Sequence, residues 1–221
     1  MKTIRITIFF LLAATVTTGA QNINWANLKV TDRHLLNGSV GVEYGMVAGV
    51  AYGYRLNTKL PVILNAGYSM PFGEKVFDDL KTSVGGQVEI LRFGNFRFSA
   101  RVNGLFRLYN NRLVRMANFG SDLSAVAGYY KSRWFIAGEA GFDKAIVTHF
   151  RHTTVYRAHF PEAVDRWYQP ATGGNFYYGA LMGVSIGRAD VYVNAGKIAT
   201  EDFRSAPYMP FYGKIGLTYK L

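Results

Sequence analysis

The chain has 221 residues, contains no cysteine and carries a formal net charge of +11 at pH 7. Charged residues make up 18% of it, below the roughly 25% of an average soluble domain, and aromatic residues make up 15%. These values exclude a disulfide framework and favour a single domain or a single closed barrel, since no stretch has the composition of a linker.

The first twenty residues, "MKTIRITIFFLLAATVTTGA", have the layout of a secretory signal peptide. Lys2 and Arg5 precede an apolar stretch at residues 6–14 that is too short to span a bilayer, and small residues precede Gln21. Export makes a nucleic-acid partner unlikely for this basic chain, and no run of Lys and Arg forms a basic arm. We expect a signal peptide at residues 1–20, an N-terminal segment at 21–34 and the main domain at 35–221.

The rest of the sequence alternates apolar and polar residues with the period of two that is typical of β-strands. After residue 20, no apolar stretch approaches the roughly 20 residues that a transmembrane helix needs, so a membrane-spanning form of this chain would be a barrel. The alternation predicts about ten strands, with a range of eight to twelve, near residues 40–44, 48–56, 62–72, 82–90, 96–108, 123–129, 134–142, 176–186, 191–195 and 211–221.

The connections between these strands also alternate. Those after the second, fourth, sixth and eighth strands are the short "NTK", "GN", "SR" and "RA", whereas those after the third, fifth, seventh and ninth are long, including a loop expected near 110–117 and one over 148–174. Only the short first hairpin departs from this rule. Short turns at one end and long loops at the other are typical of bacterial outer-membrane barrels.

Aromatic residues concentrate near the ends of the predicted strands. Such rings favour the headgroup layer, where the ring lies in lipid and a polar atom meets water. The sequence therefore predicts an aromatic girdle that includes Tyr44, Tyr68, Phe72, Phe93, Phe96, Tyr109, Tyr129, Trp134, Phe176 and Tyr219.

The stretch "NFRFSARVNGLFRLYNN" has one apolar face and one face with three arginines. In a membrane barrel Phe96, Val102 and Phe106 would face lipid, and the arginines would face the lumen. A soluble lipocalin-like barrel would place the apolar face inside. In that case "TSVGGQVEI" and "RADVYVNAGK" would be richer in outward Lys and Glu, so we favour the membrane barrel.

The final segment, "FYGKIGLTYKL", resembles the C-terminal strand of Gram-negative outer-membrane β-barrel proteins. Apolar residues recur at Phe211, Ile215, Leu217, Tyr219 and Leu221, although these proteins usually end in an aromatic residue rather than leucine. The resemblance implies an antiparallel up-and-down barrel in the outer membrane, surrounded by its lipids, with residues 35–221 as the barrel domain and residues 21–34 as a periplasmic N-terminal segment. It also implies that the barrel-insertion machinery recognises this strand.

Charged residues at strand positions that face inward determine whether the lumen is open or filled. Opposite charges in a narrow lumen should pair, because an isolated buried charge costs several kcal/mol. A barrel of about ten strands lies near the filled end of the size range, so we expect a mostly filled lumen. The alternative is a narrow diffusion channel that favours anions through its basic excess. The residues assigned to the lumen are Glu43, Arg55, Lys81, Glu89, Arg97, Arg101, Arg107, Glu139, Asp143 and Lys214, with Asp122 and Lys220.

The long segment "TTVYRAHFPEAVDRWYQPATGG" is too aromatic for a disordered tether. It would either fold as a lid over the barrel mouth or bind an extracellular ligand, since Trp, Tyr and Arg are the usual anchors of interfaces. The candidate binding residues are Tyr156, Arg157, Glu162, Asp165, Arg166, Trp167 and Tyr168.

Three histidines, His149, His152 and His159, lie in or beside this segment. They could supply a metal site or a general base, but no HExxH or GxSxG motif accompanies them, and we predict no cofactor and no bound metal. We therefore expect a structural or surface-binding protein with extracellular loops, with the channel as second interpretation. The third is a hydrolase or acyltransferase sited in the loop, by analogy with some outer-membrane barrels.

Overall fold

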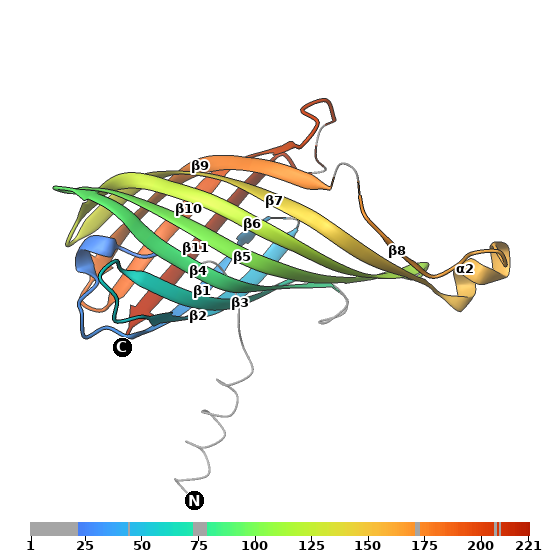
Figure 1. Ribbon diagram of the computed structural model, residues 1–221, viewed down its shortest axis with the longest axis horizontal. Coiled ribbons are helices and arrows are strands. Elements are labelled where there is room, and N and C mark those ends of the chain that lie inside the picture. Colours follow the sequence, from blue (N-terminus) through green and yellow to red (C-terminus); the bar gives the residue numbers. More distant parts are fainter. Residues whose placement is uncertain (1–21, 44, 73–78, 171–172, 206, 208) are drawn as a thin grey trace, which may run out of the picture.

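The computed structural model describes residues 22–43, 45–72, 79–170, 173–205, 207 and 209–221. The predicted signal peptide lies outside these residues, as does Tyr44 of the predicted girdle. Over the described part the fold is the predicted one, a transmembrane-type antiparallel up-and-down barrel of ten strands (Figure 1). Neither of the short helices in the described part is long and apolar enough to cross a membrane.

The strands follow one another around the ring in chain order, and a three-residue strand, β8, adds to the outer end of β7. Two short helices complete the fold, η1 (Trp25–Asn27) and α2 (Thr154–His159). The strands are β1 (His34–Val42), β2 (Met46–Arg55), β3 (Val62–Pro71), β4 (Asp79–Phe93), β5 (Phe96–Asn110), β6 (Val114–Lys131), β7 (Trp134–His152), β8 (Arg166–Tyr168), β9 (Gly174–Ile186), β10 (Ala189–Thr200) and β11 (Phe211–Lys220).

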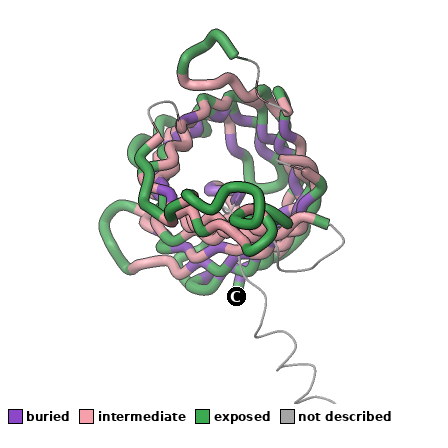
Figure 2. The backbone as a smooth tube through the Cα atoms, turned by 90° about the vertical axis from the view of Figure 1, so that its right-hand side faces the viewer, coloured by how far each residue is buried: buried purple, intermediate pink, exposed green. Residues whose placement is uncertain are grey.

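The ring closes where the first strand meets the last. β1 pairs antiparallel with β11, from Leu35 opposite Lys220 to Val42 opposite Gly213. Figure 2 looks along the barrel from the long-loop end and shows the continuous ring of strands. Closure satisfies the edge hydrogen bonds that lipid could not satisfy, which is why a sheet crosses a membrane only as a barrel.

Short turns gather at one end of the barrel and longer connections at the other (Figure 1). Gly94 and Gly187 take φ values of +57° and +60° in two-residue turns, a conformation that glycine adopts without steric cost. The turn between β9 and β10 is Gly187–Arg188, one residue earlier than expected. The loop expected at 110–117 is wrong, because β5 and β6 continue pairing outward and leave only residues 111–113 between them.

The barrel has the inverted polarity of a membrane protein. On β5, Phe96 and Val102 are exposed outward, whereas Ser99, Arg101 and Asn103 are buried inward. Outward aromatic rings form two rows. The row near the short turns consists of Phe96, Tyr129 and Trp134, with the centroid of the Tyr129 ring 5.2 Å from that of Phe96 and 5.6 Å from that of Trp134. The row toward the long loops consists of Phe106, Phe119 and Trp167. From Phe96 to Phe106 a tilted strand rises about 25 Å, the height of a typical apolar band.

Placing a charge on the lipid face tests this orientation. We expect Val102→Arg, near mid-band, to lower the free energy of unfolding by about 2–4 kcal/mol, and Phe93→Arg, at the short-turn rim, by about 0–1 kcal/mol. Urea titration of the two variants in lipid vesicles, followed by tryptophan fluorescence, would measure both values. Equal effects at the two positions would mean that Val102 does not face the bilayer interior.

Candidate functional site: the barrel lumen and its two ends

The half of the lumen nearer the long loops holds a charged zone, which we define as Glu43, Lys81, Arg107, Asp143 and Lys214. The Glu43 carboxylate accepts hydrogen bonds from the ammonium groups of Lys81 and Lys214, with an N···O distance of 2.5 Å to each. Arg107 forms an ion pair with Asp143. The side chains of this zone are 17–28% exposed. These charges therefore pair with one another and still keep contact with water.

Farther from the long loops the charges become buried. Arg101 and Glu139 face each other at 3.9 Å with side chains only 4% exposed, and Asn194 and Tyr212 each donate to Glu139 at 3.1 Å. The buried Glu89 carboxylate accepts from Arg97 at 2.9 Å. Each inward arginine of β5 therefore faces a carboxylate, and the basic excess of the chain does not lie in the lumen wall.

Near the short turns the interior becomes a packed zone of apolar and aromatic side chains. Tyr130 and Phe135 stack with centroids 5.5 Å apart, and Leu181 and Tyr192 are in the same buried cluster. The cluster is completed by Ile23 and Trp25, which are 2% and 3% exposed and come from the N-terminal segment.

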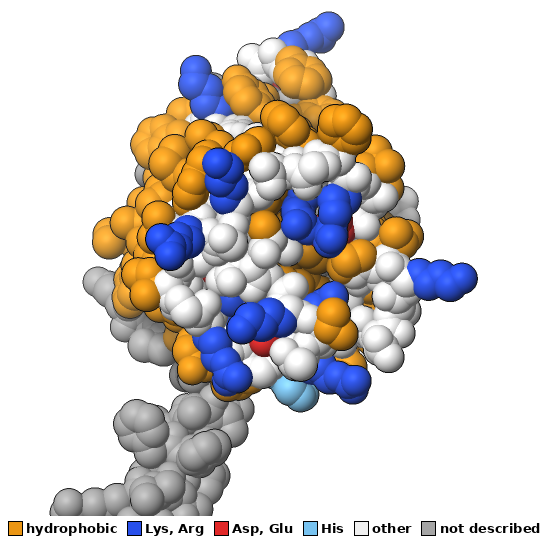
Figure 3. Space-filling model, turned by 90° about the vertical axis from the view of Figure 1, so that its left-hand side faces the viewer, with side chains coloured by type: hydrophobic (Ala, Val, Ile, Leu, Met, Phe, Trp, Pro, Cys, Tyr) orange, Lys and Arg blue, Asp and Glu red, His pale blue; other side chains and the backbone are white. Residues whose placement is uncertain are grey.

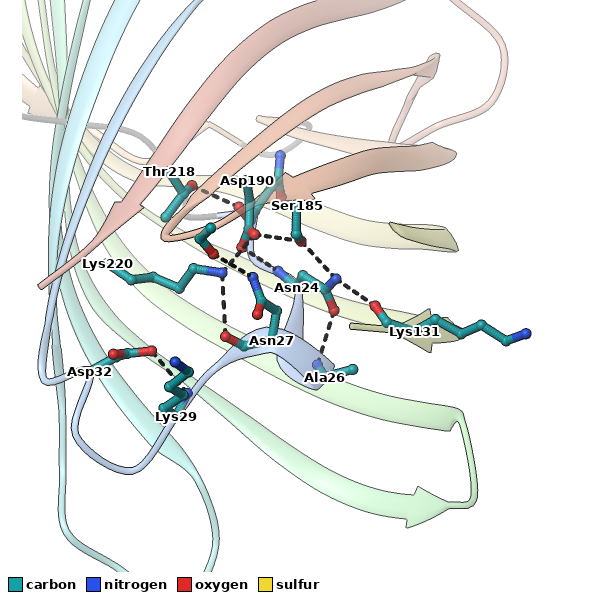
Figure 4. Close-up of polar contacts among 12 residues, drawn as sticks. Asn24, Ala26, Asn27, Lys29, Asp32, Lys131, Ser185, Asp190, Thr218 and Lys220 are labelled. Atoms are coloured by element: carbon teal, nitrogen blue, oxygen red, sulfur yellow. Dashed lines mark hydrogen bonds and ion pairs between the residues drawn. The ribbon is translucent and has the colours of Figure 1, made fainter. Parts of the chain in front are cut away.

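Residues 22–28 of the N-terminal segment, which we define as residues 22–33, therefore lie inside the short-turn end rather than in the barrel wall (Figure 4). Residues 29–33 lead from there to β1, and all of them except Asp32 are exposed. Its anchor is Asn24, whose backbone N–H donates to Asp190 at 2.9 Å and whose side-chain amide donates to the Lys131 carbonyl at 2.7 Å and to the Ser185 hydroxyl at 2.9 Å. The Asn24 side-chain oxygen in turn accepts from the backbone N–H of Ala26 and caps η1.

Asp190 links this segment to the last strand. Its carboxylate accepts from the Lys220 ammonium at 2.6 Å and from the Ser185 hydroxyl at 2.7 Å, and both ionic side chains are at most 1% exposed. One buried carboxylate thus connects β10, β11 and the N-terminal segment.

The outer surface of the short-turn end is strongly basic (Figure 3). Arg55, predicted to line the lumen, lies at this end and donates from its guanidinium to the Lys29 carbonyl of the N-terminal segment. A cavity of about 410 Å³ lies here, lined in part by Lys29, Asp32, Arg133 and Arg188.

At the opposite end, β6, β7, β8 and α2 project from the barrel as an arm (Figure 1). The candidate loop residues lie on it: Arg157 pairs with Asp165 at 2.7 Å, and Trp167 contacts His149 with centroids 4.8 Å apart. A cavity of about 510 Å³ is lined by Phe150, His152, Tyr156, Glu162, Arg166 and Tyr168, among others. The arm is therefore a folded, partly aromatic surface and not a tether.

The three histidines do not converge. His149 packs on Trp167, His152 approaches the Asp165 carboxylate at 3.2 Å, and His159 contacts the Val155 carbonyl on exposed α2. In the described part of the chain no group of three or more His, Asp or Glu side chains could hold a metal ion.

Sequence reasoning missed the residues that close the short-turn end. Asn24, Trp25 and Asp190 carry no motif, and the polar–apolar alternation at residues 22–25 is too short to assign this segment to a barrel. The available signal was the pair of buried-type residues Ile23 and Trp25, which an exposed periplasmic segment would not need.

The sequence matches no protein-family model and no curated protein. Among solved structures, the fold is similar to the KdgM porin, also solved in complex with disordered oligogalacturonate. In the two matches the sequence identity is 10%, the TM-scores are 0.41 and 0.42, and the match covers 85% of this chain and 99% of the porin. Similarity at this level carries no argument about substrate or mechanism.

The Asp190–Lys220 pair should be a major stabiliser of the closed end. We expect Asp190→Asn to lower the free energy of unfolding by about 3–5 kcal/mol, because it leaves a buried ammonium without its counter-charge. Urea unfolding in lipid vesicles would measure this, with the exposed Glu162→Gln as a control expected to change stability by less than about 0.5 kcal/mol. A loss no larger than that of the control would show that the buried pair does not stabilise the barrel.

The arm should loosen in acid. The backbone N–H of His152 and the Arg157 guanidinium lower the pKa of Asp165 from 3.8 to about 2. A lowered pKa means that the carboxylate stabilises the arm above about pH 4, and this contribution is lost as the pH falls toward 2. Pepsin cleavage within residues 153–170 should therefore accelerate over this interval.

Asp165→Asn supplies the comparison for that experiment, because it removes the titrating group. Its arm should open at pH values where the unaltered arm is closed, and its cleavage rate should change little between pH 4 and 2. A variant whose pH profile matched that of the unaltered chain would assign the acid response to another group.

Proposed function

We propose that this protein is a narrow diffusion channel of the outer membrane that is held closed by its own N-terminal segment. The observation that carries the proposal is the asymmetry of the lumen. Inward charges near the long loops keep contact with water, whereas residues 22–28 pack into the opposite end. The barrel fold and its apolar exterior support an outer-membrane location, with the long loops outside.

The nature of the closure supports a channel over a purely structural barrel. A barrel of this size can be filled by side chains from its own wall. Here a segment outside the wall completes the packed zone, through Ile23, Trp25 and the polar contacts of Asn24. A closure that is not part of the sheet can move without breaking any strand pairing.

The lumen charges predict weak ion selectivity for the open state. Arg97, Arg101, Arg107 and Lys214, the residues of the anion-selective hypothesis, each face a carboxylate. Paired charges present little net field to a passing ion. Size would therefore discriminate among solutes more than charge does.

Surface binding by the arm is the second candidate function. The observation that favours it is the cavity of about 510 Å³, which combines the rings of Phe150, Tyr156 and Tyr168 with the charges of Glu162 and Arg166. Aromatic faces beside a few polar groups are the usual composition of a small-ligand site. This function does not need an open lumen.

Removing the closure tests the channel. In planar bilayers we expect the unaltered chain to give few or no conductance steps and a variant lacking residues 22–33 to give frequent, discrete steps. The deletion removes the Ile23 and Trp25 side chains from the packed zone and so opens a path for water. Heat-modifiable gel migration would show that each variant is a folded barrel.

A milder variant guards against misfolding of the deletion. Asn24→Ala with Trp25→Ala keeps the chain length and removes the main polar and aromatic anchors, so intermittent steps are expected. Val30→Ala, at an exposed position of the same segment, is the matched control and should remain closed. Folded deletion and double variants that stay silent would mean that the wall itself fills the lumen, leaving surface binding by the arm as the better proposal.

A further inference from the structure

Two arginines lie side by side on the outer face of the barrel, near its long-loop end. Arg115 on β6 is the direct cross-strand partner of Arg151 on β7. Both arginines are exposed. Along the paired strands they alternate in step with Phe119, which faces outward, whereas Asn118 and Thr148 face inward.

Like charges in direct register repel each other and destabilise a sheet. Several cations at this end have counter-charges: Arg107 pairs with Asp143, and Lys144 pairs with Glu201 at 2.5 Å. Within the described part of the chain, no carboxylate forms an ion pair with Arg115 or Arg151; Arg115 has only the side-chain oxygen of Asn110, at 3.5 Å. The two guanidinium groups are therefore a concentrated positive charge that faces outward.

Their height on the barrel places them beside lipid headgroups. Two residues closer to the barrel on the same outer face, the rings of His149 and Trp167 are in contact. Two residues closer again lies Phe119, which belongs to the aromatic row toward the long loops. From Phe119 to Arg115 is four residues, a rise of about 10 Å along a tilted strand. Tryptophan marks the headgroup layer, so the arginines lie at its outer edge or just above it.

We propose that Arg115 and Arg151 together bind the phosphate of an anionic lipid headgroup in the outer leaflet. A guanidinium presents two parallel N–H donors that match phosphate oxygens, and two adjacent guanidinium groups can share one phosphate. Binding would replace the repulsion between the arginines with attraction to a common anion. The inference rests on the proposed membrane orientation but not on the lumen being a channel.

A lipid is the occupant that this position favours. The arginines continue a surface of Phe106, Phe119 and Trp167, which acyl chains cover, so a lipid that fills this surface brings its headgroup to the pair. A free phosphate ion would gain only the charge interaction.

The experiment measures lipid retention. The unaltered chain and an R115Q/R151Q variant are refolded into phosphatidylcholine nanodiscs containing bisphosphorylated lipid A, and bound lipid A is titrated by native mass spectrometry. Each arginine near a membrane surface contributes about a fivefold change in affinity, so the double variant should bind roughly 30-fold more weakly. Lipid A without its phosphates should bind the unaltered chain as weakly as lipid A binds the variant.

The matched control is R133Q/R188Q, which removes two exposed arginines from turns at the opposite end and changes the net charge equally. It should keep the affinity of the unaltered chain. An equal loss in both double variants would overturn the proposal in favour of general attraction to a basic protein. Full competition by inorganic phosphate would overturn it in favour of a free-anion site.

The test separates this inference from the proposed channel. Folding and insertion are checked by heat-modifiable migration, and lipid retention is measured whether or not the barrel conducts. Specific lipid retention by the unaltered chain, together with folded deletion and Asn24/Trp25 variants that stay silent in planar bilayers, would uphold the lipid site and reject the channel. Conduction by the deletion variant, with no difference in lipid retention among the arginine variants, would do the reverse.

Discussion

The closure of the sheet between β1 and β11 is the constraint on which the rest of the structure depends. An open edge in a bilayer would leave backbone groups without partners, so the ring must close, and a ring of ten strands encloses a narrow interior. The apolar side chains then face lipid and the polar ones face inward. Inward charges in so narrow a space must be neutralised by neighbours, as Glu43 is by Lys81 and Lys214.

The same constraint explains why the interior divides into two zones. Near the long loops the inward side chains are charged, and those of the charged zone, such as Arg107 and Asp143, keep contact with water. Where they are apolar, as at Tyr130 and Phe135, burial requires further apolar surface, and Ile23 and Trp25 provide it. Asp190 then holds this segment in place, because one buried carboxylate accepts from both Asn24 and Lys220.

The barrel could be predicted because apolar and polar residues alternate with a period of two along the strands. In β5 the inward residues differ in polarity from their outward neighbours, with Leu105 as an exception, so the face of Arg97, Arg101 and Arg107 follows from parity. The continued pairing of β5 with β6 could not be predicted, because residues 110–112 are the polar run Asn-Asn-Arg and residues 113–117 do not alternate strictly between apolar and polar. The packing of residues 22–33 depends on contacts with residues more than 100 positions away, such as Asn24 with Asp190, and no local pattern encodes them.

The two sets of arginines show that position, more than residue type, determines what a charge does in this barrel. Arg101 and Arg107 point into the ring, where they meet carboxylates on β7, two strands along the wall from β5. Their charges are therefore balanced within the fold. Arg115 and Arg151 have the other parity and face outward, where the described wall offers them no carboxylate. A charge that the fold neither neutralises nor buries remains available to bind something else. At this height on the outer face, the neighbouring molecules that we propose are lipids.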